Sequence, residues 1–243
     1  MTTWLAGVDC ATDPRRVGLA LARLDGERLV VLEALPGQSR EQIADQLADW
    51  LVSHPPLLLC LDAPLGWPAP LAESLSTHLA GDALPGDPDH LFSRLTDREL
   101  RTRLGKRPLE VGANFIARTA RSALALLEDL RERTGQAIPL PLQSGPLAES
   151  MSVEVYPAGV LATRPDAPAG DKRKADVREK LLEWLAEEME LPKATYEAAL
   201  ASDHVADALL CLLAGKDFLL GRAVAPGSHQ IDAARREGWI WSV

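Results

Sequence analysis

The stretch Leu57–Trp67, LLLCLDAPLGW, decides the fold class of this sequence. It opens with an unbroken apolar run, typical of a strand that is buried on both faces of a parallel sheet, and the run ends at a carboxylate, Asp62. The segment WLAGVD near the start of the chain has the same form, because apolar residues from Trp4 to Val8 lead directly into Asp9. Two buried strands that each end in an acid predict an α/β protein.

The segments between these two strands predict an antiparallel meander followed by a crossover. Val17–Leu24 and Arg28–Leu35 have the pattern of strands, and the Asp25-Gly26 dipeptide between them favours a tight hairpin turn. A helix capped by Ser39 is expected to run through Leu51. Because strand–helix–strand units join parallel strands by a right-handed crossover, we expect Leu57–Asp62 to lie parallel to an earlier strand.

The rest of the chain is predicted to be mainly helical. Residues 64 to about 112 are rich in proline, glycine and histidine, which indicates a helical and loop insertion within a single domain spanning 1–243. Within it, the sequence TDRE at 96–99 has the form of a capping box. Outside it we expect helices at Phe115–Arg133, at Lys172–Glu188 and from Ser202 to a C-cap at Gly215, a half-buried strand at Ser152–Tyr156, and a last short strand or packed tail at EGWIW, 237–241.

The composition is that of an ordinary globular protein and argues against several classes. The chain has 243 residues, 47% of them hydrophobic and 25% charged, with a formal net charge of −9. This charge argues against tight, sequence-blind binding to duplex DNA, which relies on Lys and Arg contacts to phosphates. No apolar run approaches the ~18 residues of a membrane span. The three cysteines have no zinc-binding spacing and are expected to be reduced, as in a cytoplasmic protein.

The two strand-end acids are the first candidates for chemistry. If the strands of Asp9 and Asp62 are parallel neighbours, their ends lie about 4.8 Å apart at the carboxyl edge of the sheet, where open α/β sheets bind ligands. Carboxylates that close repel each other unless a proton or a cation lies between them, and oxygen ligands favour Mg²⁺ or Mn²⁺. The alternative is that each Asp caps the turn that follows it.

The late helix carries a second set of candidates. Asp203, His204 and Asp207 project from about one face of this helix. Asp203 is explained by the helix dipole alone. Asp207 lies in an otherwise apolar helix, where an unpaired charge is costly, so it predicts either a site or a salt bridge to an arginine. Glu154 lies on the strand face opposite Val153 and Val155, a face that could point to solvent.

These residues carry a resemblance to a known family. The motifs LDAPLGWP, RLTDRELR, VEVYP and DHVADAL occur in this order along the chain. They resemble those of the DUF429 family of predicted nucleases in the ribonuclease H-like superfamily, and the late helix is similar to that of RuvC-type Holliday junction resolvases. The resemblance implies a three-layer ribonuclease H-like α/β fold, in which an antiparallel meander is followed by parallel strands and a helical insertion follows the fourth strand.

The resemblance also implies a metal-dependent nuclease. It makes Asp9, Asp62 and Asp207 ligands of Mg²⁺ or Mn²⁺, with the fourth ligand open between Asp203 and His204. Two such ions about 3.5–4 Å apart would activate water and stabilise the departing oxygen of a phosphodiester. The catalytic set is then Asp9, Asp62, Glu154, His204 and Asp207.

The substrate of such a site is less closely defined by the sequence. Arg94 and Arg98, in the basic segment RLTDRELRTRLGKR, are the expected contacts to substrate phosphates, although a solvated helix face is the alternative. The acidic charge and the scarcity of aromatic residues leave room for a hydrolase or transferase of a small nucleotide or other phosphorylated compound. A non-catalytic binding protein on the same scaffold is a third reading. The chain has no GxSxG, P-loop, GxGxxG or HExxH motif.

Overall fold

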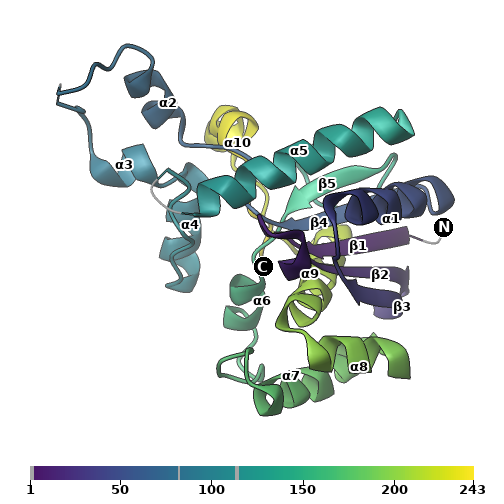
Figure 1. Ribbon diagram of the computed structural model, residues 1–243. Coiled ribbons are helices and arrows are strands. Elements are labelled where there is room, and N and C mark those ends of the chain that lie inside the picture. The colour runs from purple at the N-terminus through teal and green to yellow at the C-terminus, as the bar shows by residue number, and fades with distance from the viewer. Residues whose placement is uncertain (1–2, 82, 113–114) are drawn as a thin grey trace.

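A mixed six-stranded sheet forms the centre of the computed structural model, which describes residues 3–81, 83–112 and 115–243 (Figure 1). The strand order is β5-β4-β1-β2-β3-β6. The strands are β1 Thr3–Asp9, β2 Gly18–Asp25, β3 Arg28–Pro36, β4 Leu57–Asp62, β5 Met151–Glu154 and β6 Met189–Glu190.

The strand directions confirm the predicted α/β class and its mixed sheet. Strands β1, β2 and β3 are antiparallel neighbours, and the hairpin between β2 and β3 turns at Gly26, whose φ of +60° suits a glycine. Strand β4 is parallel to both β1 and β5, and β6 is parallel to β3. This topology is consistent with a ribonuclease H-like fold.

Helices cover both faces of the sheet, which gives three layers (Figure 1). On one face α1 and α5 pack their apolar stripes against β1, β2 and β4, and on the other face α9 packs with α7 and α8. The helices are α1 Arg40–Ser53, α2 Ala69–Leu75, α3 Pro88–Phe92, α4 Leu95–Leu104, α5 Ile116–Thr134, α6 Pro157–Ala162, α7 Ala175–Glu188, α8 Lys193–Ala201, α9 Asp203–Leu219 and α10 Ile231–Glu237, with 3₁₀ turns η1 Pro14–Arg16 and η2 Ser228–Gln230.

Helix α9 lies unusually close to the sheet because glycines line the contact. A Cβ atom at Gly7 would lie 2.1 Å from the carbonyl oxygen of Ala208, and one at Gly18 would lie 1.9 Å from that of His204. The predicted C-cap at Gly215 is wrong, since α9 continues to Leu219. A Cβ at Gly215 would lie 2.3 Å from the Cys60 sulfur, so this glycine serves close packing. The first turns of α9 are thereby pressed against the sheet.

The segment between β4 and α5 projects from the sheet as helices α2, α3 and α4 joined by loops (Figure 1). Helix α4 begins at Leu95, before the predicted capping box at 96–99. Its first turn is capped instead by Asp97, whose carboxylate accepts the Arg94 backbone N–H at 3.0 Å. In the described ranges, no helix is both long and apolar enough to cross a membrane.

The C-terminal tail packs beside β5. Ile240 forms an isolated parallel bridge with Glu154, and the Trp241 N–H donates to the Glu154 carbonyl at 3.0 Å. The Trp241 ring meets Phe218 of α9 edge-on at 4.8 Å. Of the two predictions for this segment, the packed tail is the one that describes it.

Candidate functional site

The strand-end acids Asp9 and Asp62 are direct neighbours. They are paired in register at the ends of the parallel strands β1 and β4, so both side chains start from the carboxyl edge of the sheet. Asp9 is buried and Asp62 is half-buried. The parallel pairing of β1 and β4 is therefore enough to bring these two carboxyl groups together.

The close packing of α9 adds His204 and Asp207 to this edge. The His204 Nδ1 lies 2.7 Å from Oδ2 of Asp9. The Nε2 of the same ring lies 3.9 Å from Oδ1 of Asp203, the first residue of the helix. Asp207 follows one turn later, and its charge raises the pKa of both Asp9 and Asp62. We call Asp9, Asp62 and Asp207 the acid cluster.

Burial raises the pKa of every carboxyl group in the acid cluster, and repulsion within the cluster adds to this for Asp9 and Asp62. Burial raises the pKa of Asp9 to about 6, although the hydrogen bond with His204 opposes this. Burial, then the charges of Asp9 and Asp207, hold the pKa of Asp62 well above its usual range. Burial also raises the pKa of Asp207. The cluster therefore favours either protons or a cation at neutral pH.

Lys172 is the cation that the sequence did not reveal. It precedes α7, which begins at Ala175 rather than at the predicted Lys172, and its ammonium group contacts Oδ1 of Asp207. Its charge lowers the pKa of Asp9, Asp62 and Asp207 alike. The carbonyl of Lys172 accepts a hydrogen bond at 2.8 Å from Arg178 of α7, which holds the loop in place. The single positive charge of Lys172 compensates only part of the negative charge of the acid cluster.

The donor set of the acid cluster fits a hard divalent cation. Its members are carboxylates, the ligands that Mg²⁺ and Mn²⁺ prefer. In the part of the chain that the structure describes, Asp62 has no hydrogen-bond or ion-pair partner. Asp207 is held by Lys172 and Asp9 by His204, and no three His, Cys, Asp or Glu side chains among the described residues surround one point as ligands do. These side chains therefore have to turn toward a metal for it to bind.

A cleft opens over Asp9 and Asp207 of the acid cluster, and Asp62 is not among the described residues that line it. Its volume is about 650 Å³, and Asp9, Asp203, His204 and Asp207 line it together with Arg16 and Phe115. Arg16 forms no ion pair within the described residues, and Phe115 is 77% exposed. Sequence reasoning missed both residues, although the position of Arg16 in the turn directly after β1 was a usable signal.

Comparison with known proteins identifies the family. A family model described as "Protein of unknown function (DUF429)" matches residues 7–231. The chain belongs to the DUF429 family. The match spans the whole acid cluster, from Asp9 in β1 to Asp207 in α9. A search of curated proteins found no match.

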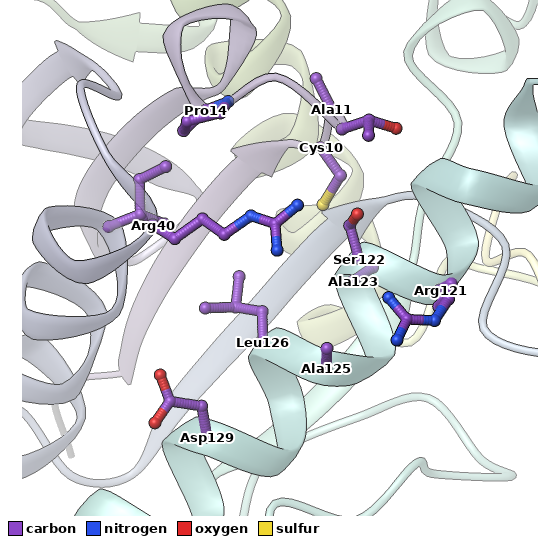
Figure 2. Close-up of a pocket in the computed structure, with 12 residues that line it drawn as sticks. Cys10, Ala11, Pro14, Arg40, Arg121, Ser122, Ala123, Ala125, Leu126 and Asp129 are labelled. Atoms are coloured by element: carbon purple, nitrogen blue, oxygen red, sulfur yellow. The ribbon is translucent and has the colours of Figure 1, made fainter.

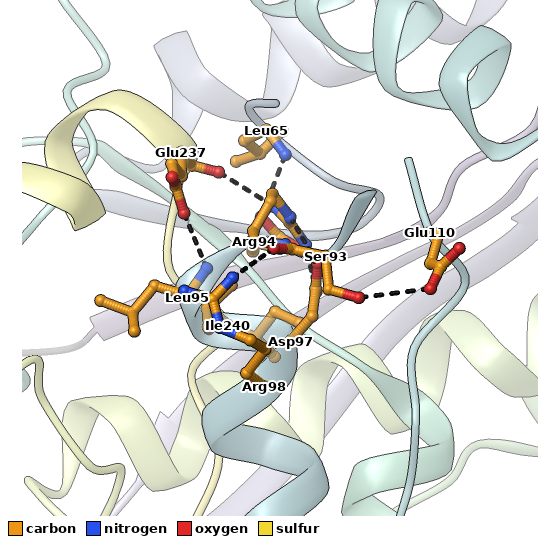
Figure 3. A network of polar contacts seen from close by, with 11 residues as sticks. Leu65, Ser93, Arg94, Leu95, Asp97, Arg98, Glu110, Glu237 and Ile240 are labelled. Atoms are coloured by element: carbon orange, nitrogen blue, oxygen red, sulfur yellow. Dashed lines mark hydrogen bonds and ion pairs between the residues drawn. The ribbon is translucent and has the colours of Figure 1, made fainter. Parts of the chain in front are cut away.

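The two arginines predicted to bind phosphate do not reach the cleft of this DUF429 protein. Arg94 is 1% exposed, and all its side-chain N–H groups are used (Figure 3). It forms paired contacts with Glu154 at 2.7 and 2.8 Å and with Asp97 at 2.9 and 3.1 Å, and it donates to the Glu237 carbonyl at 3.1 Å. The side chain of Arg98 donates to the carbonyls of Ser93 and Asp89. Both arginines therefore hold the fold together.

Glu154 does not face solvent, which was one of the two readings of its place on the strand. Its side chain is 3% exposed, and Oε2 also accepts the Leu65 backbone N–H at 3.0 Å. Glu237 completes the group by accepting the N–H groups of Ala69 at 3.0 Å and Leu95 at 2.7 Å. We call Arg94, Asp97, Glu154 and Glu237 the arginine network (Figure 3). In this DUF429 protein the network joins the insertion, β5 and the C-terminal segment.

Proposed function

We propose that this protein is a metal-dependent phosphoester hydrolase that binds Mg²⁺ or Mn²⁺ at the acid cluster. The observation that carries the proposal is the convergence of Asp9, Asp62 and Asp207 at one sheet edge, where Asp62 has no partner among the described residues. Acids that are buried without full compensation cost stability, so a protein that keeps them has a use for their charge. Asp203 stands beside the cluster as a further ligand candidate.

The chain's own residues supply the other parts of such a reaction. A bound divalent cation would act as a Lewis acid and lower the pKa of its water. His204 is hydrogen-bonded to Asp9, and this bond raises the pKa of the imidazole, so His204 can hold a proton near neutral pH for the departing oxygen. Lys172 neutralises part of the charge until a metal arrives, and Arg16 is placed in the cleft to contact the phosphate.

The surroundings favour a small phosphate ester over a nucleic acid strand. The arginines of the basic segment expected to follow a nucleic acid backbone make internal contacts. Besides Arg94 and Arg98, Arg101 and Arg107 both pair with Asp89, at 2.9 and 3.1 Å. Lys and Arg contacts to phosphates supply much of the affinity for a nucleic acid strand, and the arginines of this segment are already engaged. We therefore place hydrolysis of a small nucleotide or another phosphorylated compound ahead of nuclease activity.

Turnover of chromogenic esters in the presence of Mn²⁺ tests this proposal. Bis-nitrophenyl phosphate serves as the diester, nitrophenyl phosphate as the monoester, and single-stranded and duplex oligonucleotides as the polymers. We expect metal-dependent hydrolysis of a small ester, loss of that activity in Asp62→Asn, and its retention in Arg23→Ala, a variant at a half-buried position of β2. If Mn²⁺ binds to the acid cluster but neither small esters nor oligonucleotides are hydrolysed, the protein is a non-catalytic binding protein.

A further inference from the structure

A second cavity adjoins the cleft over the acid cluster (Figure 2). Its volume is about 230 Å³, and it lies between the turn after β1, the start of α1 and the middle of α5. An engineered cavity of about 150 Å³ in another protein accommodates benzene. The cavity beside α5 is therefore large enough for one ring system, and much too small for a nucleic acid duplex.

The floor of this cavity is apolar. Ile43 of α1 and Ala123 and Leu126 of α5 line it, and the first two are buried. The Cys10 sulfur points into the space from the end of β1 (Figure 2). A flat apolar group placed against this floor would bury its own surface and that of the floor, which favours binding.

The rim of the cavity is cationic. Arg40 extends over the space and Arg121 stands at its α5 edge (Figure 2), and neither has an ion-pair partner among the residues that the structure describes. The carboxylate in the lining, Asp129, is already paired with Arg133 at 2.7 Å. The two free guanidinium groups therefore attract an anion, and their planar fork of donors suits a phosphate.

The cavity and the cleft share the turn after β1 as a common wall. Cys10, Ala11 and Thr12 line both of them, and Asp9 directly precedes this segment. A molecule that occupies the cavity therefore lies one turn of chain away from Asp9.

We propose that this cavity binds the ring-bearing end of a small organic phosphate, with its ring on the floor and a phosphate group held by Arg40 and Arg121, while the ester to be cleaved lies in the cleft. This inference rests on the proposed function and narrows it to substrates in which a nucleotide-like group flanks the reacting phosphate. The ring and the anion are both needed, since one matches the floor and the other matches the rim.

Calorimetric titration with adenosine monophosphate tests the cavity without any turnover. With EDTA present, we expect native protein to bind adenosine monophosphate at least about tenfold more tightly than adenosine or inorganic phosphate. The double variant Arg40→Ala, Arg121→Ala should weaken binding by about tenfold or more, and Ala125→Phe, which fills the cavity from the exposed side of α5, should abolish it. Arg23→Ala, a charge loss on β2, should bind like native protein.

Three results would overturn the cavity proposal. One is the absence of binding to native protein, and another is equal binding of inorganic phosphate. The third is a loss of binding in Arg16→Ala with none in the double variant, because Arg16 lines the cleft and not the cavity. Asp62→Asn should keep its affinity for adenosine monophosphate. If the metal-dependent hydrolysis fails while this affinity and its dependence on Arg40 and Arg121 remain, the proposed function is wrong and the cavity stands.

Discussion

The acid cluster and the arginine network are both groups of acids brought together by the fold, and they differ in how their charge is compensated. In the network, Arg94 gives every N–H of its guanidinium to Asp97, Glu154 and the Glu237 carbonyl, and backbone N–H groups take the remaining acceptors. In the cluster, Asp207 pairs with Lys172 and Asp9 with His204, and Asp62 has no partner among the described residues.

This difference indicates that the arginine network has a structural role and that the acid cluster has a functional one. A buried acid that is fully hydrogen-bonded stabilises the fold, and removing its partner is costly. An acid such as Asp62, half-buried and without a partner among the described residues, destabilises the fold until a cation binds. Substitutions that remove charge from the two groups should therefore have opposite consequences.

The largest effect is expected from Arg94→Ala. The substitution leaves Asp97 and Glu154 buried without their cation, which costs about 3–5 kcal/mol. For a chain of 243 residues this lowers the melting temperature by roughly 6–20 °C. Urea unfolding of Arg94→Ala and Arg98→Ala measures the change, and Arg98→Ala, which loses hydrogen bonds to carbonyl groups only, should cost about 1 kcal/mol. Equal costs in the two variants would contradict the network's role.

The sharpest test of the comparison applies one chemical change to both groups. Glu154→Gln should destabilise the metal-free protein by about 2 kcal/mol, because the amide cannot replace the paired contacts to Arg94. Asp62→Asn should stabilise the metal-free protein by about 1 kcal/mol, because it removes an unpaired charge beside Asp9. Denaturant unfolding in EDTA measures both. Two changes of the same sign would show that the groups do not differ in the way we describe.

Lys172→Met should destabilise the metal-free protein by about 1 kcal/mol. The cost is modest because the ion pair with Asp207 is partly exposed. Its more informative effect is on metal binding. Removing the ammonium group leaves Asp207 free to face a cation, so the stabilisation by Mn²⁺ should increase. Lys193→Met is the matched control, because Lys193 is an exposed lysine on α8. An unchanged response to Mn²⁺ in Lys172→Met would argue against an exchange of lysine for metal.

The smallest effect is a pH dependence of unusual sign. The pKa of Asp9 is about 6 in the folded protein, above its unfolded value of 3.8, so the folded chain holds more protons between these values. The contribution of Asp9 to the free energy of unfolding therefore falls as the pH rises from 3.8 through about 6. Acidifying the metal-free protein from about pH 7 to about pH 5.5 should raise its free energy of unfolding by about 0.8 kcal/mol. The raised pKa values of Asp62 and His204 act in the same direction. Asp9→Asn should lose the part of this gain that comes from Asp9.

Local patterns predicted the part of the site that lies on single elements. Strands that end in an acid gave the Asp9–Asp62 pair, and helical spacing gave His204 and Asp207, because these signals lie within a few residues. The β1–β2–β3 meander and the parallel β4 followed from the same kind of local pattern.

The errors arose where partners come from distant parts of the chain. Arg94 was expected at the substrate because Glu154, 60 residues away, and Glu237, 143 residues away, were not known to meet it. Lys172 was missed because it reaches Asp207 across 35 residues. Gly215 was taken for a helix end, since nothing in its neighbourhood shows that Cys60 packs against it.

Thermal unfolding with and without Mn²⁺ tests the central claim most directly. A ligand at a hundred times its dissociation constant stabilises a protein by about 2.7 kcal/mol, or roughly 5–10 °C for a chain of this length. We predict this shift for native protein and for Glu154→Gln, and its loss in both Asp9→Asn and Asp62→Asn. A shift that survives in both aspartate variants, or no shift in native protein, would contradict metal binding at the acid cluster.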